Sequence, residues 1–367
     1  MQSHRTPSDS LADGYAQARA GSLPEARLLA LTTAVPPFVL TQKDVAERAS
    51  VLFGGRGDIE RLLPVFANAG IERRYSCVPI GWYLEDHGWK ERNRLFLDHA
   101  VALLEQAGDA AIRQAGLTRD AIDAIVVNST TGIATPSLDA LLIERMGLRR
   151  DVARLPIFGF GCAGGVLGLT RAGQMARIMP GAHILFLTVE LCALTFRRND
   201  SSKSNLVAAA LFGDGAAAAI LCTEGDGPRL GAAGEYTWPG SLDVMGWDVE
   251  DDGLKARFSQ SIPALVGRDF RGLAYGFADK NAIALKRIDR FALHPGGAKV
   301  LDALEAALDL APGALEDSRA VLRDFGNMSA ATVLFILARM RERRQRGDIL
   351  MGALGPGFTA AFLMLQD

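Results

Sequence analysis

The feature that most constrains the fold is a regular alternation, from about residue 27 onward, of amphipathic segments with short apolar runs. The amphipathic segments have the spacing of helices that bury one face, and the apolar runs have the length of buried strands. This alternation is typical of an α/β protein in which helices cover a sheet in layers. With 367 residues, the chain is long enough for two domains or for one large core.

The alternation predicts a definite set of elements. Helices are expected over 90–116, 137–146, 163–178, 205–212, 262–274, 298–310 and within 313–346. Strands are expected over 121–128, 155–158, 183–190, 216–222, 289–293, 348–353 and 359–365. We expect Gly213, Asp214 and Gly215 to form a turn, and the polar, glycine-rich stretch 224–234 to be a connection. The chain then divides into a flexible arm (1–26), an N-terminal half (27–225) and a C-terminal half (226–367).

Charge, hydropathy and cysteine usage exclude several classes of protein. Lys and Arg total 40 against 42 Asp and Glu, so no basic field is present to attract a nucleic acid. The most apolar stretch, 206–222, is interrupted by Gly-Asp-Gly, and the polar N-terminus has no signal-peptide core, so neither integral membrane association nor secretion is expected. The four cysteines form no CxxC pair and do not cluster with the five histidines, which predicts free thiols, no metal site and a cytoplasmic location.

Cys162 is the first candidate for chemistry, in the sequence LPIFGFGCAGGVLGLTRAG. A predicted strand ends just before it, glycines bracket it and a predicted helix follows. Backbone N–H groups and the dipole at a helix N-terminus favour a thiolate, the nucleophilic form of cysteine. A small buried cysteine in a tight turn is the alternative. A hydrolase nucleophile elbow is excluded, because it needs glycine two residues before the nucleophile, where this chain has Phe160.

His294 and Asn327 are the other two candidates. His294 follows a predicted strand in RIDRFALHPGGAKVLDAL, where it could project into a cleft and supply a proton or an Nε2–H donor. Asn327 follows a glycine before a long predicted helix. Taken singly, His294 would be interpreted as a histidine in a turn and Asn327 as the N-cap of a helix. Together with Cys162 they form a coherent set: a thiolate accepts an acyl group, and imidazole and carboxamide N–H groups stabilise an oxyanion.

Five sequence blocks around these residues resemble the signatures of the type III polyketide synthases, the chalcone synthase-like branch of the thiolase fold. The blocks are FGFGCAGG around Cys162, ALHPGG around His294, GNMSAATVLFIL around Asn327, LFGDGAAAAI at 211–220 and GALGPGFTAAF at 352–362. They occur in the family's order, and the resemblance extends from about residue 27 to the C-terminus. It implies an α/β, thiolase-like fold of two similar halves in an αβαβα arrangement, and a homodimer.

The resemblance also implies the reaction. Cys162 would take a starter acyl group from coenzyme A, and His294 and Asn327 would promote decarboxylation of malonyl-CoA. The thioester enolate formed in this way would attack the Cys162 thioester. Acyl-CoA and malonyl-CoA would be the substrates, with no permanently bound cofactor and no metal.

Further positions carry over from the family as binding residues. The substrate-binding set is Phe212, Thr130, Thr131, Thr135, Cys192, Thr195, Trp247, Ala256, Ser329, Gly355 and Pro356. Small side chains at Thr135 and Ala256 would open one side of the pocket. Trp247 lies at a position where the family has a glycine, and its indole would fill part of the pocket and leave a narrow tunnel. The alternative is that the indole only fills the core.

The coenzyme A set is Arg61, Gly296, Gly297 and Lys299, whereas Pro64 and Asn68 stand where the family has further cations. The blocks DVMGWDV and ERRYSCVPIGWYLEDHGWKERN resemble the bacterial alkylresorcinol and alkylpyrone synthases. A long-chain acyl starter, extended with malonyl-CoA and cyclised to an alkylpyrone or alkylresorcinol, is therefore the leading hypothesis. A single condensation like that of β-ketoacyl-acyl-carrier-protein synthase III and a catalytically silent acyl-binding scaffold are the alternatives.

Overall fold

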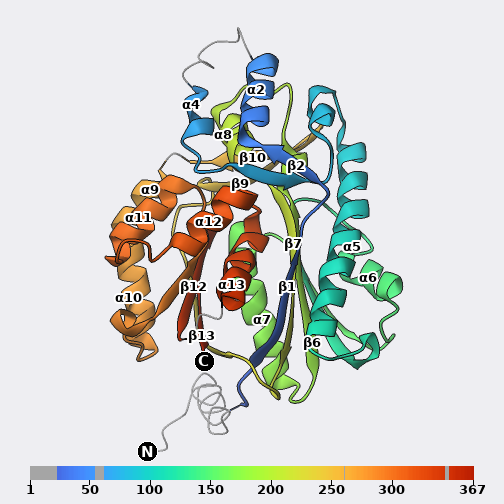
Figure 1. Ribbon diagram of the computed structural model, residues 1–367, viewed down its shortest axis with the longest axis vertical. Helices are drawn as coiled ribbons and strands as arrows, with labels where there is room; N and C mark the ends of the chain where they lie inside the picture. The colour runs from blue at the N-terminus through green and yellow to red at the C-terminus, as the bar shows by residue number, and fades with distance from the viewer. Residues whose placement is uncertain (1–22, 54–61, 260, 344–346) are drawn as a thin grey trace, which may run out of the picture.

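The computed structural model describes residues 23–53, 62–259, 261–343 and 347–367; most of the expected N-terminal arm lies outside these ranges. Within them, nine strands form one mixed sheet in the order β11-β12-β13-β8-β1-β7-β6-β4-β5 (Figure 1). The strands of this sheet are β1 (Arg27–Ala34), β4 (Ile122–Asn128), β5 (Ala153–Ile157), β6 (His183–Leu191), β7 (Asp214–Cys222), β8 (Arg229–Thr237), β11 (Arg290–Leu293), β12 (Ile349–Gly355) and β13 (Thr359–Gln366).

Helices cover both faces of this sheet. The longer helices are α2 (Gln42–Phe53), α5 (Trp89–Gln114), α6 (Leu138–Met146), α7 (Gly164–Ile178), α8 (Lys203–Leu211), α10 (Arg271–Lys280), α11 (Ala298–Leu308), α12 (Glu316–Phe325) and α13 (Thr332–Glu342). Two single-turn helices are α4 (Pro64–Ala67) and α9 (Ile262–Leu265). No helix in the described part of the chain is both long and apolar enough to cross a membrane.

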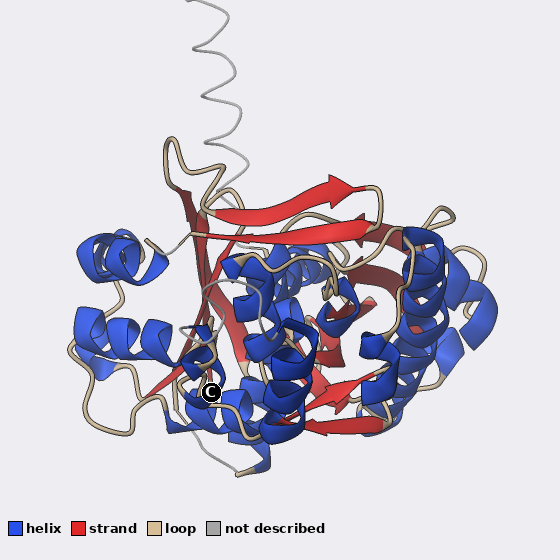
Figure 2. Ribbon diagram, turned by 90° about the horizontal axis from the view of Figure 1, so that it is seen from above, coloured by secondary structure: helices blue, strands red, loops and turns tan. Residues whose placement is uncertain are grey.

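The order of the layers follows from which faces of the helices and of the sheet are apolar. Helices α7 and α13 are buried on nearly all sides, and their side chains form one core cluster with residues from both arms of the sheet. Helices α5 and α6 cover the outer face of the arm that contains β4, β6 and β7, and α10 and α11 cover the outer face of the arm that contains β11, β12 and β13. Helices therefore lie outside and between the two arms, which gives the expected αβαβα order (Figures 1 and 2).

The two arms join at β1 and β8. These strands share a single paired position, Arg27 opposite Arg229, whereas β1 pairs with β7 and β8 pairs with β13 along most of their lengths. Strands β5 and β11 lie at the two outer edges of the sheet, and each is parallel to its neighbour. The segments that follow β5 and β11 contain Cys162 and His294.

A further group of elements covers one end of the sheet, at the top of Figure 1. It consists of α2, α4, α8 and two small two-stranded sheets. Strand β2 (Phe38–Thr41) pairs with β3 (Arg73–Ser76), and β9 (Met245–Glu250) pairs with β10 (Gly253–Phe258). Of these elements, the sequence pattern predicted only α8.

Two expectations about local structure were wrong, and one expected helix differs in detail. Asp214 and Gly215 begin strand β7 instead of forming a turn: the Asp214 carboxylate accepts hydrogen bonds from the backbone N–H groups of Cys77 and Ala193. Much of the expected connection 224–234 is strand β8, because its backbone pairs with β13. The helix expected over 262–274 is α9, a π-helical turn (Val266–Phe270) and α10 in succession.

Candidate active site

Cys162 lies in a tight turn between β5 and α7. The turn, Gly161–Ala163, directly precedes the first residue of α7. Gly161 has φ +49, and a Cβ on it would lie 2.5 Å from Pro356 Cδ, so both the backbone and the space require glycine there. Its N–H donates to Thr130 Oγ1 at 3.1 Å. The turn that contains Cys162 is thus held at the start of α7 by contacts with both halves of the chain.

His294 directly follows β11. Its backbone N–H donates to Gly352 O at 2.8 Å, which continues the pairing of β11 with β12 and fixes where the side chain leaves the sheet. The imidazole is only 4 % exposed, and neither ring nitrogen has a hydrogen-bond partner in the described structure. A buried imidazole without partners has both nitrogens available to a ligand.

Asn327 lies between α12 and α13, in a segment bound to α8. Its N–H donates to Leu211 O at 2.8 Å, and its carbonyl accepts from Gly213 N at 3.0 Å. The side-chain Oδ1 accepts from Ser329 N at 2.8 Å. Because Oδ1 is engaged in this way, the Nδ2 amide is left as the donor that Asn327 can offer to a ligand.

These three side chains line a single cavity of about 480 Å³, although they are far apart in the sequence. The wall is largely apolar, with contributions from Val65, Val207, Leu211, Phe258, Ile262 and Leu354. A thiol, an imidazole and a carboxamide therefore face one apolar space from three different elements. Such a set can accept an acyl group on sulfur and donate N–H groups to a developing oxyanion.

Burial controls the protonation states in this cavity. Desolvation raises the pKa of the Cys162 thiol to about 12, against a hydrogen bond with Ser329 that lowers it. Desolvation lowers the pKa of His294 to about 3. We expected the start of α7 to favour the thiolate, but burial outweighs that effect, and both groups are neutral at pH 7 in this structure. Formation of the thiolate therefore requires a proton acceptor. The imidazole on the same cavity can take that proton only if thiolate and imidazolium form together, so that each charge stabilises the other.

Glu190, at the end of β6, is a buried acid that sequence reasoning missed. Its Oε2 accepts from Thr130 N at 3.0 Å and from Thr131 Oγ1 at 2.9 Å, and Oε1 has no partner in the described structure. Desolvation raises its pKa to about 8, although the bonds from both threonines lower it. The available signal was an acidic residue in the otherwise apolar run HILFLTVEL. Thr130 and Thr131, two expected pocket residues, thus hold this carboxyl group.

The expected pocket residues near Phe212 form a small cluster behind the cavity. Cys192, Phe212 and Ala256 are buried together and pack against Trp247 and Phe258. Trp247 and Ala256 are directly opposite each other on β9 and β10. The rings of Phe212 and Trp247 have centroids 6.0 Å apart. Phe258 also lines the 480 Å³ cavity, so this cluster separates the cavity from the region beyond it.

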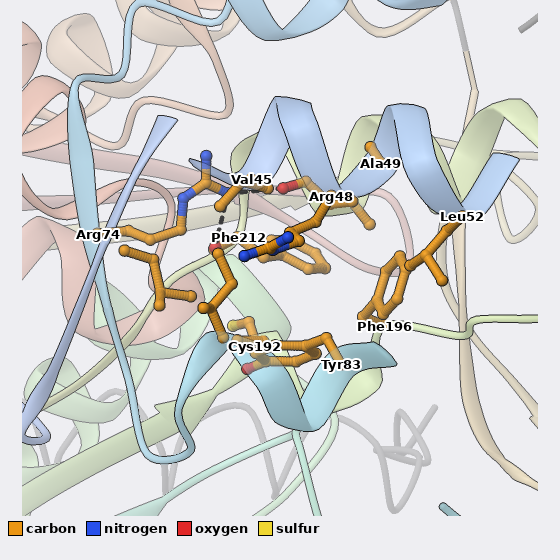
Figure 3. A pocket seen from close by; sticks show the side chains of 14 residues that line it. Val45, Arg48, Ala49, Leu52, Arg74, Tyr83, Cys192, Phe196 and Phe212 are labelled. Carbon is orange, nitrogen blue, oxygen red and sulfur yellow. Dashed lines mark hydrogen bonds between the residues drawn. The ribbon is translucent and has the colours of Figure 1, made fainter. Parts of the chain in front are cut away.

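Beyond the cluster lies a second, apolar cavity of about 60 Å³ (Figure 3). Phe212 and Cys192 line one side, and Leu52 and Phe196 line the other. The Arg74 guanidinium borders this space while donating to the carbonyl oxygens of Ala209, Ala210 and Phe212 at the end of α8. Sequence reasoning missed this arginine, since nothing local indicates that it is buried.

The remaining expected residues have different surroundings. Thr195 borders a space of about 10 Å³ with Thr131, and its Oγ1 donates to Cys192 O at 2.7 Å. Thr135 is exposed and lines none of these three cavities. Ser329 is buried beside Asn327 with φ +47. Gly355 packs against the Cys162 turn, where a Cβ would lie 2.5 Å from Phe160 O.

The structure describes only part of the expected coenzyme A set. Gly296, Gly297 and Lys299 line the 480 Å³ cavity, and Arg61 lies outside the described residues. Pro64 and Asn68 also line the cavity, so that wall has no cation among its described residues. Lys203, at the start of α8, lines the cavity too and was missed by sequence reasoning. No group of three or more potential metal ligands occurs among the residues that the structure covers.

The layered fold and the buried Cys-His-Asn set are those of a class of condensing enzyme. Comparison with known families shows which family of that class the chain belongs to. Residues 85–225 match the N-terminal domain of chalcone and stilbene synthases, and residues 230–366 match the C-terminal domain. The chain belongs to this family. It is a type III polyketide synthase with the thiolase-like fold, an acyltransferase that performs decarboxylative condensation of coenzyme A thioesters.

Individual relatives match the chain over nearly its whole length. The chain is 36 % identical over 359 residues to a putative chalcone synthase of Bacillus subtilis, covering 92 % of this chain and 98 % of that protein. It is 37 % identical over 348 residues to a 1,3,6,8-tetrahydroxynaphthalene synthase of Streptomyces peucetius, covering 92 % of each. The crystal structure of the Streptomyces coelicolor 1,3,6,8-tetrahydroxynaphthalene synthase superposes with a TM-score of 0.89 at 29 % identity, covering 93 % of this chain and 99 % of that one.

Proposed function

We propose that Cys162, His294 and Asn327 are the catalytic residues of this polyketide synthase. The observation that carries the proposal is their common cavity, in which Asn327 Oδ1 is held by Ser329 and both nitrogens of His294 are unpartnered. Cys162 takes the starter acyl group and releases coenzyme A. His294 and Asn327 donate N–H groups to the thioester oxygen of malonyl-CoA as carbon dioxide leaves, and the resulting enolate attacks the acyl group on Cys162.

His294 has a different protonation state in each of the two steps. During loading the imidazole accepts the Cys162 proton, and the thiolate that forms in the same cavity offsets the burial that otherwise lowers the pKa of His294. During decarboxylation, a neutral N–H stabilises the enolate without drawing the malonyl carboxylate into an ion pair that would favour the ground state. The low pKa that burial imposes on His294 therefore favours the neutral imidazole during decarboxylation, whereas loading requires the pairing of imidazolium with thiolate.

We further propose that the starter is a long-chain acyl-CoA and the product an alkylpyrone or alkylresorcinol. The apolar wall of the 480 Å³ cavity and the second apolar cavity beyond Phe212 support this substrate class. In this account, the tail passes the cluster of Phe212, Cys192 and Ala256, and Trp247 narrows the path. The second cavity has room for only about four water-sized groups, so the longest tails require the Phe212 side chain to move.

Product analysis tests this proposal. Incubation with a ladder of acyl-CoAs of increasing length and malonyl-CoA should give pyrones or resorcinols, with the highest kcat/KM for long starters. Trp247→Gly should give longer or differently cyclised products, because it removes the indole that packs on Phe212. An unchanged product profile in that variant, or a preference of the wild-type enzyme for short starters, would contradict the proposal that a long acyl tail passes a tunnel narrowed by Trp247.

A single condensation on an acyl carrier protein is the rival reaction, and the same assay separates the two. The rival predicts a β-ketoacyl product after one malonyl unit, formed only when malonyl-acyl carrier protein is supplied. Our proposal predicts products that contain at least two malonyl units and form from acyl-CoA and malonyl-CoA without any acyl carrier protein.

We also propose that the enzyme is a cytoplasmic homodimer. The outer strand β5 ends the sheet beside the Cys162 turn, and Leu155 and Phe158 there are 36 % and 61 % exposed. Apolar side chains on an unpaired strand edge favour association with a second copy. All four cysteines are free, as suits a reducing compartment. Sedimentation analysis should give twice the chain mass, and Phe158→Asp should give monomers.

A further inference from the structure

Ser241 is a buried serine in the connection between β8 and β9. Pro239 and Gly240 precede it, and the φ of +63 at Gly240 suits the third position of a type II turn. This turn brings the Ser241 hydroxyl back to Trp238, to whose carbonyl oxygen it donates at 2.6 Å. Ser241 is only 5 % exposed. Its hydroxyl is therefore held inside the protein, and its oxygen can still accept a hydrogen bond from another segment.

That second bond holds the turn between β12 and β13. The turn consists of Pro356, Gly357 and Phe358. The Phe358 N–H donates to Ser241 Oγ at 2.7 Å, and the Phe358 carbonyl accepts from Trp238 N at 2.9 Å. Gly357 O, at 3.2 Å, is a second and more distant acceptor for the single hydroxyl proton of Ser241. Both backbone groups of Phe358 are therefore bonded to the connection between β8 and β9.

The same turn packs directly against the turn that contains Cys162. A Cβ on Gly161 would lie 2.5 Å from Pro356 Cδ, and a Cβ on Gly355 would lie 2.7 Å from the Ala163 side chain. Because the two turns are in such close contact, neither can shift toward the other without moving it. A displacement of the turn between β12 and β13 would therefore be transmitted to Cys162.

We propose that Ser241 is a positioning residue for acyl transfer: its hydroxyl fixes the turn between β12 and β13, and that turn fixes Cys162 at the start of α7. This inference rests on the proposed function, in which Cys162 takes the acyl group. Ser241 does not line the 480 Å³ cavity, so it acts through the turn and not on the substrate. Loss of the hydroxyl removes the acceptor of the Phe358 N–H, and Phe358 is fully buried.

The rate of acyl transfer in Ser241→Ala tests this inference. The single-turnover rate of Cys162 acylation at saturating acyl-CoA should fall about 10-fold, since small displacements of a reacting group are costly. The acyl-CoA concentration that gives half the maximal rate should change less than about 2-fold, because the hydroxyl does not touch the substrate. Ser318→Ala is the matched control, since Ser318 is fully buried and its Oγ has no partner among the described residues. Ser241→Thr retains the hydroxyl and should restore most of the rate.

Two further measurements separate positioning from a general loss of structure. Gly355→Ala displaces the same pair of turns, so Ser241→Ala should slow acylation less in the Gly355→Ala background than in the wild-type background. Amide hydrogen exchange in residues 158–163 requires no reaction. It should be faster in Ser241→Ala than in wild type and unchanged in Ser318→Ala.

Four results would overturn the inference. They are acylation at the wild-type rate in Ser241→Ala, an equal loss of rate in Ser241→Thr or in Ser318→Ala, additive effects of Ser241→Ala and Gly355→Ala, and unchanged hydrogen exchange in residues 158–163. Failure of the proposed function gives a different result. Exchange in residues 158–163 would then respond to Ser241→Ala as predicted, while the wild-type enzyme would take up no acyl group on Cys162.

Discussion

Asn327 and Phe212 form an isolated parallel β-bridge between the segment before α13 and the end of α8. The bridge consists of Asn327 N to Leu211 O at 2.8 Å and Gly213 N to Asn327 O at 3.0 Å. The backbone of a candidate catalytic residue is therefore hydrogen-bonded to both chain neighbours of Phe212, a residue of the proposed substrate wall. A displacement of α8 would move both the wall at Phe212 and the amide donor of Asn327.

Arg74 is predicted to secure this bridge. It is fully buried and donates to three carbonyl oxygens at the end of α8 and to Gln42 Oε1. Arg74→Met leaves those carbonyls unsatisfied and should lower the free energy of unfolding by about 3 kcal/mol or more. Denaturant unfolding measures the loss. Arg73→Met, on the exposed face of the same strand, should cost less than about 0.5 kcal/mol, and equal losses in the two variants would refute the role of Arg74.

Asn327→Asp separates the two functions of this side chain. The carboxylate keeps an acceptor for Ser329 N but removes the Nδ2 donor and adds negative charge where the enolate forms. Decarboxylation of malonyl-CoA, followed as carbon dioxide release, should fall about 100- to 1000-fold. Acyl loading on Cys162 should persist, because it does not use the enolate. Loss of loading and decarboxylation in equal measure would mean that the substitution disrupts the whole cavity.

Glu190 should make stability depend on pH. Burial raises its pKa in the folded protein to about 8, from an ordinary 4.5, so the folded state binds this proton more tightly than the unfolded state. Its contribution to stability is fully present below about pH 4.5 and is lost as the pH rises through about 8. Glu190→Gln should therefore flatten the decrease in unfolding free energy between pH 5 and 9, by an amount on the order of a few kcal/mol. Glu47→Gln, on the exposed face of α2, should leave the decrease unchanged; an unaltered slope in Glu190→Gln would contradict the assignment.

Gly355 is predicted to be essential for the position of the Cys162 turn. A Cβ there would lie 2.5 Å from Phe160 O and 2.8 Å from Ala163 N, so the turn must shift. Gly355→Ala should reduce the rate of Cys162 acylation at least about 10-fold, since small displacements of a reacting group are costly. Gly246→Ala, where a Cβ would meet nothing within 4 Å, is the control. Wild-type acylation in Gly355→Ala would show that the turn tolerates displacement.

Much of the fold was predictable because it depends on local patterns. The apolar runs that became β4, β6 and β12, and the amphipathic run that became α5, agree with expectation within a few residues. Periodicity could not predict the elements whose existence depends on distant partners. Strand β8 lies in a glycine-rich stretch and exists because β13 pairs with it. The hairpin β9–β10 was missed although 247–250 and 254–258 alternate apolar and charged residues, which is the pattern of a half-exposed strand.

The candidate site was predictable to the same degree. Cys162, His294 and Asn327 each follow the end of an element, with glycine or proline close by, and that arrangement is visible in the sequence. Lys203 and Arg74 carry no such mark. Lys203 resembles any surface lysine until the cavity is seen, and Arg74 is one of two adjacent arginines, of which only this one is buried.

The measurement that tests the central claim most directly is the mass of the protein after incubation with a long-chain acyl-CoA in the absence of malonyl-CoA. The account predicts one added acyl group per chain, located by peptide mapping on Cys162, absent from Cys162→Ala and released by malonyl-CoA as product. The other three thiols are buried and line no part of the 480 Å³ cavity, so they should remain unmodified. A chain that takes up no acyl group, or takes it up on a residue other than Cys162, would contradict the account.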